Sequence, residues 1–364
     1  MALYNGYGVE IENPASFFKS GLYNGNGEIL SVSDAFMTND LLNEIENMSS
    51  KTGVKFAFLT DLHFSGEGQL MQHKNTVNPY WSIAVIEEIC KRGLVEAVVI
   101  GGDIINAYAD SYNSTLEDAV NRIETMLESF ETHGIPLYIV KGNHDLNTKY
   151  DDVLGDTNYP NRVGDDEWQA ITEKYETDAV FNEADKKGYY YVDLSNDVRL
   201  CIWNQYTGEC VDTSGIEGDG TGTTQTYWFR DNVYVDGKTI VTILHNPEQY
   251  ASAQFMMTRF FCDGGTNNGK IWSGGQKAFC ITAHTHADNL TYLYDGSMVQ
   301  NVPNFNIQNA FAITESTAVN VAIHEGNDRA CVSIFTIDSE NNHVYETRIG
   351  RGTDRESDFC TVTT

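Results

Sequence analysis

The chain has 364 residues, 41% of them hydrophobic, which is enough for one large α/β domain or two smaller ones. It carries 52 acidic and 23 basic residues, and the formal net charge of −29 argues against nucleic acid or an anionic membrane as a partner. Bound divalent cations would still make one cleft locally positive, so a nuclease stays open as an alternative. Seven cysteines without a C-x-x-C pair argue against a disulfide framework and leave a single Cys201–Cys210 bridge open.

Targeting signals are the next feature. The N-terminus lacks the basic and apolar segments of a signal peptide, and no apolar run reaches membrane-spanning length. We therefore expect no membrane span and a cytoplasmic or virion-associated protein.

Residues 1–33 are rich in Gly, Tyr and Asn, and turn dipeptides separate short alternating pieces. This pattern predicts small strands or hairpins that form an N-terminal extension to a domain at 34–364. The extension is interpreted either as an edge elaboration or as an arm that docks on a partner.

A helix is predicted next, with Thr38 or Asn39 as its N-cap. Its apolar face comprises Leu41, Leu42, Ile45 and Met48.

Apolar runs predict strands at 54–59, 97–100 and 135–140, and apolar residues in helical spacing predict helices near 79–92 and 115–133. This β-α-β-α-β series favours parallel strands joined by right-handed crossovers.

The next part of the chain is acidic and irregular, with a helix predicted near 167–177. Two apolar runs, 189–194 and 199–203, are separated by Ser-Asn-Asp and predict a hairpin. The Gly/Thr-rich stretch 207–226 is interpreted as a loop.

Tyr227-Trp228-Phe229 is expected to lead into a strand at 239–244, followed by a helix near 247–261 and a strand at 278–282. After residue 287 the pattern is mostly of period two. It predicts antiparallel strands that form a second sheet.

A polar block directly follows five of the apolar runs. Since α/β sheets bind ligands at the carboxyl ends of their strands, we expect the five blocks to converge. They are Asp61-Leu62-His63, Gly101-Gly102-Asp103, Gly142-Asn143-His144-Asp145, His245-Asn246-Pro247 and Ala283-His284-Thr285-His286.

These blocks offer carboxylates, imidazoles and an amide, but no thiolate. Such a mixed set suits Mn, Fe, Zn or Co better than Ca or Mg. Seven ligands are too many for one tetrahedral ion, and a shared carboxylate makes two sites possible. The candidate metal ligands are Asp61, His63, Asp103, Asn143, His245, His284 and His286.

The order D-x-H, G-D, G-N-H-D, H and H-x-H resembles the calcineurin-like metallophosphoesterase superfamily over residues 54–350. The resemblance implies an α/β fold of two packed mixed β-sheets flanked by helices, the four-layer sandwich of that superfamily. It also implies two divalent metal ions, with Mn favoured. Asp103 would bridge the two ions. The first ion would be held by Asp61, His63 and His286, and the second by Asn143, His245 and His284.

The resemblance also implies catalytic roles. A hydroxide that bridges the metals would be the nucleophile. His144 would be the proton donor to the leaving oxygen, or a stabiliser of charge on the transferring phosphorus. Asp145 would orient His144 or cap the next segment, and both readings stay open.

Departures from the family pattern narrow the substrate. Phosphatases of phosphoprotein serine and threonine carry G-D-x-x-D-R, whereas this chain has Asn106 and Ala107 at the last two positions. The phosphate-binding arginine is therefore missing, which argues against a protein phosphatase. The segment 345–352 is similar to the tails of bacterial and phage-encoded members.

We therefore expect a metal-dependent phosphoesterase acting on a small molecule or a cell-envelope polymer, with a phosphodiester slightly preferred over a monoester. One alternative is a nuclease of the same superfamily. Another is a catalytically silent surface or tail-associated binding protein that docks through residues 1–33.

Overall fold

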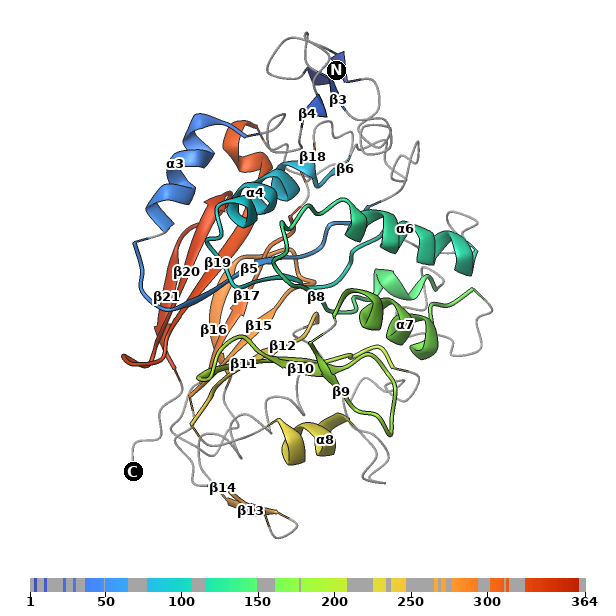
Figure 1. The fold of residues 1–364 in the computed structure, drawn as a ribbon, viewed down its shortest axis with the longest axis vertical. Coiled ribbons are helices and arrows are strands. Elements are labelled where there is room, and N and C mark those ends of the chain that lie inside the picture. The colour runs from blue at the N-terminus through green and yellow to red at the C-terminus, as the bar shows by residue number, and fades with distance from the viewer. Residues whose placement is uncertain are drawn as a thin grey trace.

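The structure is a computed structural model in which two β-sheets lie face to face with helices on their outer sides (Figure 1). This confirms the predicted fold of two packed mixed sheets flanked by helices. The structure describes residues 3–4, 10–11, 22–23, 29–30, 37–48, 50–64, 77–106, 115–148, 161–176, 178–207, 225–233, 237–246, 265–267, 270–272, 277–293, 302–310, 312–313 and 325–359.

The first sheet has six strands in the order β21-β20-β19-β5-β7-β8. The neighbours β5, β7 and β8 are parallel, and the intervening helices are α4 (Tyr80–Lys91) and α6 (Leu116–Glu128), as the β-α-β-α-β pattern predicts. The strands are β5 (Val54–Leu59), β7 (Ala97–Ile100), β8 (Leu137–Ile139), β19 (Cys331–Asp338), β20 (His343–Gly350) and β21 (Arg355–Asp358).

The second sheet has seven strands in the order β16-β17-β15-β12-β11-β10-β9. Its four middle strands, β11, β12, β15 and β17, are parallel, and β10 and β11 form the predicted hairpin. The strands are β9 (Val180–Phe181), β10 (Tyr190–Asp193), β11 (Val198–Ile202), β12 (Thr239–Ile243), β15 (Ala278–Thr282), β16 (Asn289–Leu293) and β17 (Val302–Asn306).

One sheet prediction is wrong. The strands after residue 287 do not form a sheet of their own, since β16 and β17 join the seven-stranded sheet while β19, β20 and β21 extend the six-stranded one. A period of two shows that a strand has two faces, but it does not show which neighbour the strand pairs with. Here β19 pairs antiparallel with β5, and the Phe335 ring stacks on Phe56 at 5.3 Å between centroids.

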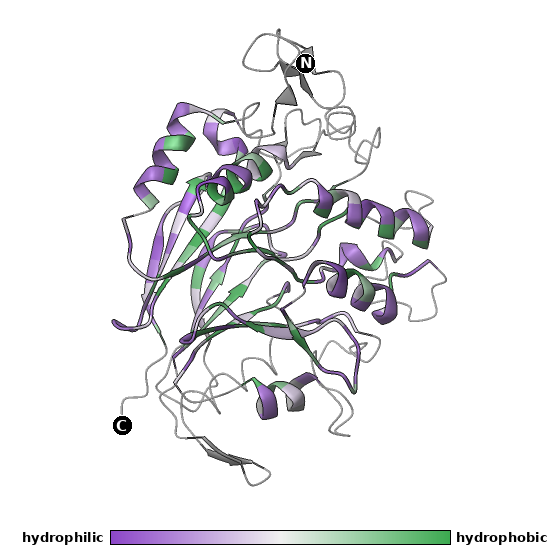
Figure 2. Cartoon of the chain, in the orientation of Figure 1, coloured by the Kyte–Doolittle hydropathy of each residue, from purple (hydrophilic) through white to green (hydrophobic). Residues whose placement is uncertain are grey.

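Alternation along the strands divides the hydrophobic core in two. On β5, Phe56 and Phe58 point into the core between the sheets, whereas Ala57 and Leu59 point into the core beneath the helices. Both cores are almost inaccessible to solvent. Figure 2 shows hydrophobic and hydrophilic residues alternating along α3 (Asn39–Met48), α6 and α7 (Asp165–Tyr175), as expected for helices with one buried face.

The helices begin near the predicted positions. Thr38 caps α3 (Asn39–Met48), because its Oγ1 accepts a hydrogen bond from the Leu41 amide at 3.2 Å. α6 begins after Thr115, which forms a capping box with Asp118, and it ends at Glu128, five residues before the predicted end. α7 spans Asp165–Tyr175.

α8 (Gln225–Asn232) was not predicted, because the aromatic run at 227–229 was expected only to lead into the strand at 239–244. Tertiary packing decides otherwise: Phe229 lies against Trp203 on the outer face of the seven-stranded sheet, with ring centroids 4.5 Å apart.

Smaller elements complete the described chain. Two antiparallel pairs lie in the N-terminal 33 residues, as predicted, although the domain boundary at residue 33 stays a prediction. No described helix is long and apolar enough to cross a membrane. The remaining elements are β1 (Leu3–Tyr4), β2 (Glu10–Ile11), β3 (Leu22–Tyr23), β4 (Ile29–Leu30), β6 (Val77–Asn78), β13 (Gly265–Asn267), β14 (Lys270–Trp272), β18 (Ala312–Ile313), η1 (His144–Leu146) and η4 (Gly326–Arg329).

Three expectations fall outside the described residues: the helix near 247–261, most of the loop 207–226, and the partner cysteine of the open Cys201–Cys210 bridge.

Candidate metal centre

All five polar blocks lie at carboxyl ends of strands. Three of these strands, β5, β7 and β8, belong to the six-stranded sheet, and two, β12 and β15, belong to the seven-stranded sheet. The candidate site therefore lies where the strand ends of the two packed sheets meet.

The backbone of these blocks is unusual. Eight described non-glycine residues have positive φ, and five of them are predicted ligands. This conformation is costly for a residue with a side chain and persists where surrounding contacts enforce it, often at functional sites. The five are Asp61 (53°), His63 (47°), Asp103 (50°), His284 (65°) and His286 (54°).

The first two turns hold each other in place. The Asp61 amide donates to the Gly102 carbonyl at 2.9 Å, and the His63 amide donates to the Asp103 carbonyl at 3.0 Å. Each strained turn thus supplies the hydrogen bonds that stabilise its neighbour.

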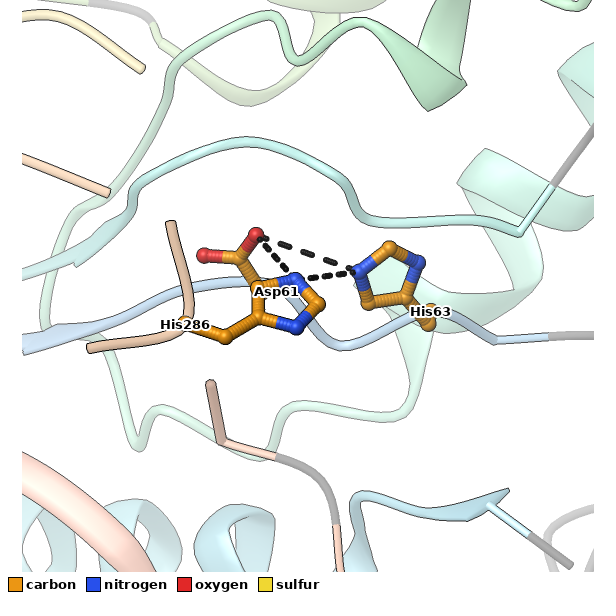
Figure 3. A group of neighbouring side chains, drawn as sticks. All are labelled: Asp61, His63 and His286. Carbon is orange, nitrogen blue, oxygen red and sulfur yellow. Dashed lines mark hydrogen bonds and ion pairs between the residues drawn. The ribbon is translucent and has the colours of Figure 1, made fainter. Parts of the chain in front are cut away.

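Asp61, His63 and His286 point toward one another (Figure 3). The Nε2 atom of His286 lies 3.1 Å from Asp61 Oδ1 and 3.1 Å from His63 Nε2. The third edge of this triangle, between His63 Nε2 and Asp61 Oδ1, is 3.8 Å. Two imidazole nitrogens and a carboxylate oxygen converge, as the ligands of one divalent ion would.

Asp103, His245 and His284 form a second group, whose ligand atoms lie within 4.8 Å of one another. His245 Nδ1 is 2.8 Å from the Gly101 carbonyl, which can only accept, so Nδ1 carries the hydrogen. His245 Nε2 faces Asp103 Oδ2 at 3.2 Å. A backbone carbonyl on the other ring nitrogen is a common support for a metal-binding histidine.

Asp103 connects the two groups. Its Oδ2 atom lies 3.2 Å from His245 Nε2, 3.8 Å from His63 Nε2 and 3.9 Å from His144 Nε2. Its Oδ1 atom accepts a hydrogen bond from the His144 amide at 2.8 Å. One carboxylate is thus within reach of imidazoles from three different strand ends.

The G-N-H-D turn follows β8. Asn143 is buried, and its Oδ1 atom has no hydrogen-bond partner among the described residues. An amide oxygen in that condition is suited to binding a cation. The His144 ring meets the His63 ring edge-on at 4.5 Å between centroids, and its side chain keeps 15% exposure.

Asp145 joins this turn to the preceding one. Its carboxylate accepts hydrogen bonds from the Gly142 amide at 2.8 Å and from the Ile105 amide at 3.1 Å. Burial, reinforced by the nearby Asp103, raises the pKa of Asp145 to about 7. These contacts connect Asp145 to Gly142 in its own turn and to the turn after β7, and both roles considered for Asp145 stay predictions.

The electrostatics suit ligand chemistry. Burial, reinforced by His144, lowers the pKa of His63 to about 3, so this imidazole is neutral. Burial opposes ionisation of Asp103, but the neighbouring His245 and His144 hold its pKa well below the usual range. Burial also opposes protonation of His245, yet Asp103 raises the pKa of His245 to about 9. Metal ligation needs neutral imidazoles and ionised carboxylates, so a metal at His245 would displace a proton.

Two glycines allow the turns to close. A Cβ atom on Gly142 would lie 2.1 Å from the Asp103 amide nitrogen, and one on Gly102 would lie 2.6 Å from His245 Nδ1. Any side chain at these positions would push the ligand turns apart.

The sequence did not reveal that a sixth strand end, that of β11, also supports the candidate site. Gln205 follows β11, donates from Nε2 to the Asn246 carbonyl at 2.8 Å and accepts from the Asn246 amide at 2.7 Å. This reciprocal pair fixes the residue next to His245. The signal that could have revealed it is Asn204-Gln205, directly after the apolar run 199–203.

The predicted site residues therefore come together in space, although their roles as ligands and catalysts stay predictions. The donor set of carboxylate oxygen, imidazole nitrogen and one amide oxygen without a described partner fits divalent metal ions.

Comparisons with known proteins agree with this geometry. A family model described as calcineurin-like phosphoesterase matches residues 54–288. No match was found among curated protein sequences. Among solved structures, a dimetal phosphatase from Danio rerio is similar at a TM-score of 0.50 and 10% identity, over 85% of this chain and 100% of that one. A purple acid phosphatase from yellow lupin seeds (Lupinus luteus) has a TM-score of 0.49 and 12% identity, over 86% of this chain and 54% of that one.

The Danio rerio likeness supports the fold, and the family match extends over more than half of the chain. The family implies two divalent metal ions, and the candidate ligand groups lie at the expected strand ends. The chain therefore belongs to the calcineurin-like phosphoesterases, metal-dependent hydrolases of phosphoric esters.

Proposed function

We propose that this protein hydrolyses a phosphodiester with two divalent metal ions, Mn favoured, that share Asp103. The observation that carries the proposal is the position of Asp103 Oδ2, within 4 Å of Nε2 atoms from His63, His144 and His245. One ion would be held by Asp61, His63 and His286, and the other by Asn143, His245 and His284.

When bound, a pair of divalent ions activates water and neutralises charge on an in-line phosphoryl group. The chain's own contribution is orientation. His144 comes from a turn that is tied to Asp103 through its backbone amide. Its partly exposed imidazole would donate a hydrogen bond to the leaving oxygen or to a phosphoryl oxygen.

Charge favours a diester over a monoester. A diester carries one negative charge at neutral pH and a monoester carries close to two, while the protein carries a formal charge of −29. The arginine that binds the monoester group in protein phosphatases is also replaced by Ala107. We propose a small molecule or a cell-envelope polymer as the source of the diester.

The test combines metal analysis with turnover. Total metal is measured on the purified protein and after loading with Mn, and bis-p-nitrophenyl and mono-p-nitrophenyl phosphate are then compared as substrates. About two ions per chain and faster diester turnover are expected, and Asp103→Asn is expected to lose both metal and turnover.

Each other outcome has a defined meaning. Monoester turnover alone would contradict the diester proposal, and no metal after Mn loading would contradict the metal centre. Metal binding without turnover on either ester, or on short DNA and RNA, would favour the silent binding protein.

A further inference from the structure

The turn 283–288 carries two proposed ligands, His284 and His286. Both have left-handed backbones, with φ of 65° and 54°. His286 is also the most exposed of the histidines grouped in the centre, with 39% of its side chain accessible. This turn needs contacts that offset its backbone strain. One comes from another proposed metal ligand, since the His284 amide donates a hydrogen bond to Asp61 Oδ2 at 3.3 Å.

Asn306 supplies such contacts from the end of the adjacent strand β17. Its side chain is buried, with 3% exposure of the residue. Its Nδ2 group donates to the Ala287 carbonyl at 2.8 Å and to the Thr285 hydroxyl. Thr285 and Ala287 are the two residues that flank His286, so one amide group forms hydrogen bonds to the turn on both sides of a proposed ligand.

The other end of the Asn306 amide is anchored to the sheet. Its Oδ1 atom accepts a hydrogen bond from the Thr282 hydroxyl at 3.2 Å, at the last residue of β15. The amide therefore connects the rigid strand to the strained turn that follows it.

A partly buried network of charged side chains contacts the backbone of Asn306. Arg355 donates to the Asn306 carbonyl at 3.1 Å and to Asp288 Oδ1 at 3.4 Å, and it also pairs with Glu346. Asp288, two residues after His286, accepts from the Gln308 amide at 3.2 Å. Arg348 pairs with both Asp288 and Glu346, so two guanidinium groups balance two carboxylates.

This network connects the C-terminal segment 345–352 to the turn that carries His284 and His286. Glu346 is completely buried, although carboxylates are rarely buried without partners. Its partners are the two arginines and the Ser333 hydroxyl at 2.7 Å. The segment thus fixes the end of the His284–His286 turn.

We propose that Asn306 is a positioning residue that holds the His284–His286 turn in its metal-binding conformation. The inference rests on the proposed metal centre and adds a residue that the motifs do not contain. Without the Asn306 amide, the left-handed residues relax toward ordinary backbone conformations and the imidazoles move off the ions.

Asn304 is a matched control. It lies two residues earlier on the same strand and therefore on the same face, and it is 2% exposed. Its Oδ1 atom lies 3.3 Å from the Thr282 hydroxyl, whose single hydrogen it shares with Asn306, and its Nδ2 group donates to the Thr291 hydroxyl at 3.4 Å. The Asn304 side chain thus bonds to strands β15 and β16, whereas the Asn306 side chain bonds to β15 and to the turn.

The test measures Mn affinity by competition with a chelator, without using activity. Asn306→Ala and Asn304→Ala are compared with the wild type, together with their melting temperatures. We expect Asn306→Ala to weaken at least one Mn site by about 10- to 100-fold, the range for residues that orient metal ligands. Asn304→Ala is expected to stay within about twofold of the wild type at a similar loss of melting temperature.

The outcomes separate the two proposals. Equal Mn affinities for Asn306→Ala and Asn304→Ala, with a wild type that binds Mn, would overturn the role of Asn306 alone. A wild type that binds no Mn would overturn the metal centre itself. If Asn306→Ala does not fold, Thr285→Val decides, because it removes the exposed hydroxyl partner at nearly constant volume. An unchanged Mn affinity in that variant would count against the role.

Discussion

At the scale of single residues, the centre depends on backbone conformations that most side chains avoid. Asp61, His63 and Asp103 lie in the left-handed region, and the adjacent glycines permit close contact between turns. The cost is offset by hydrogen bonds between the turns, such as that from the His144 amide to Asp103. Small changes here should therefore alter chemistry more than stability.

His144→Ala tests the catalytic role at this scale. We expect turnover to fall by about 10² to 10⁴-fold with metal content unchanged, since general acid catalysis contributes that much. If His144 is the proton donor, the loss will be larger for a diester with a phenolate leaving group than for p-nitrophenolate. An equal loss for both would favour stabilisation of phosphoryl charge, and an unchanged turnover would exclude both roles.

Gly142→Ala tests the close contact between turns. Its Cβ would overlap the Asp103 amide at 2.1 Å, so we expect loss of Mn binding measured by calorimetry. Gly134→Ala is the control, because its Cβ would meet no atom within 4 Å while its φ of 87° still strains an alanine. The control should lose about 1–2 kcal/mol of stability and keep its Mn affinity. Retained affinity in Gly142→Ala would contradict the argument.

At the scale of elements, an edge strand of the first sheet is completed by side chains. The Ile139 amide on β8 donates to Glu176 Oε1 at 2.8 Å and lies 2.9 Å from the Tyr190 hydroxyl. The Tyr190 hydroxyl also donates to Glu176 Oε1 at 2.5 Å. A carboxyl group and a phenol thus occupy the place of a neighbouring strand and link the two sheets.

Glu176→Gln is expected to make stability less dependent on pH. Burial raises the pKa of Glu176 well above its ordinary value, so the folded state holds a proton that the unfolded state has lost. The contribution of Glu176 to wild-type stability therefore falls as pH rises above the unfolded pKa, by up to about 1.4 kcal/mol per pH unit until the folded pKa is reached. Glutamine has no such proton to lose.

The measurement is urea unfolding of both proteins at several pH values between 5 and 8. The free energy of unfolding of the variant minus that of the wild type should increase with pH. A difference independent of pH would show that Glu176 is ionised in the folded protein.

At the scale of the whole molecule, the candidate centre joins the two sheets. The group of Asp61, His63 and His286 draws on β5 and β15, and the group of Asp103, His245 and His284 draws on β7, β12 and β15. Each group thus contains residues from both sheets. Metal binding should therefore stabilise the packing of one sheet on the other.

Mn is accordingly expected to raise the melting temperature and a chelator to lower it. A ligand at 100 times its dissociation constant stabilises the folded state by about 2.7 kcal/mol per site. Differential scanning calorimetry with increasing Mn measures the effect, and Asp103→Asn should abolish most of it. A melting temperature that does not respond to Mn would contradict metal binding between the sheets.

Much of the centre could be predicted from the sequence because each block is local. The apolar run 97–100 and the following Gly-Gly-Asp lie within seven residues, and hydrophobic run length together with turn chemistry defines such a strand end. The same reasoning predicted the parallel series β5, β7 and β8. It also predicted that the blocks would converge, because α/β sheets bind ligands at the carboxyl ends of their strands.

What only the tertiary structure decided depends on contacts between distant segments. Four such contacts join residues that are distant in the chain. They are the pairing of β19 with β5, the packing of α8 against Trp203, and the hydrogen bonds of Gln205 and of Asn306. Asn306 ends the short strand β17, and the five residues of that strand do not distinguish it from any other strand residue. Its role depends on the His284–His286 turn beside it, and the sequence around Asn306 does not show which segment will lie there.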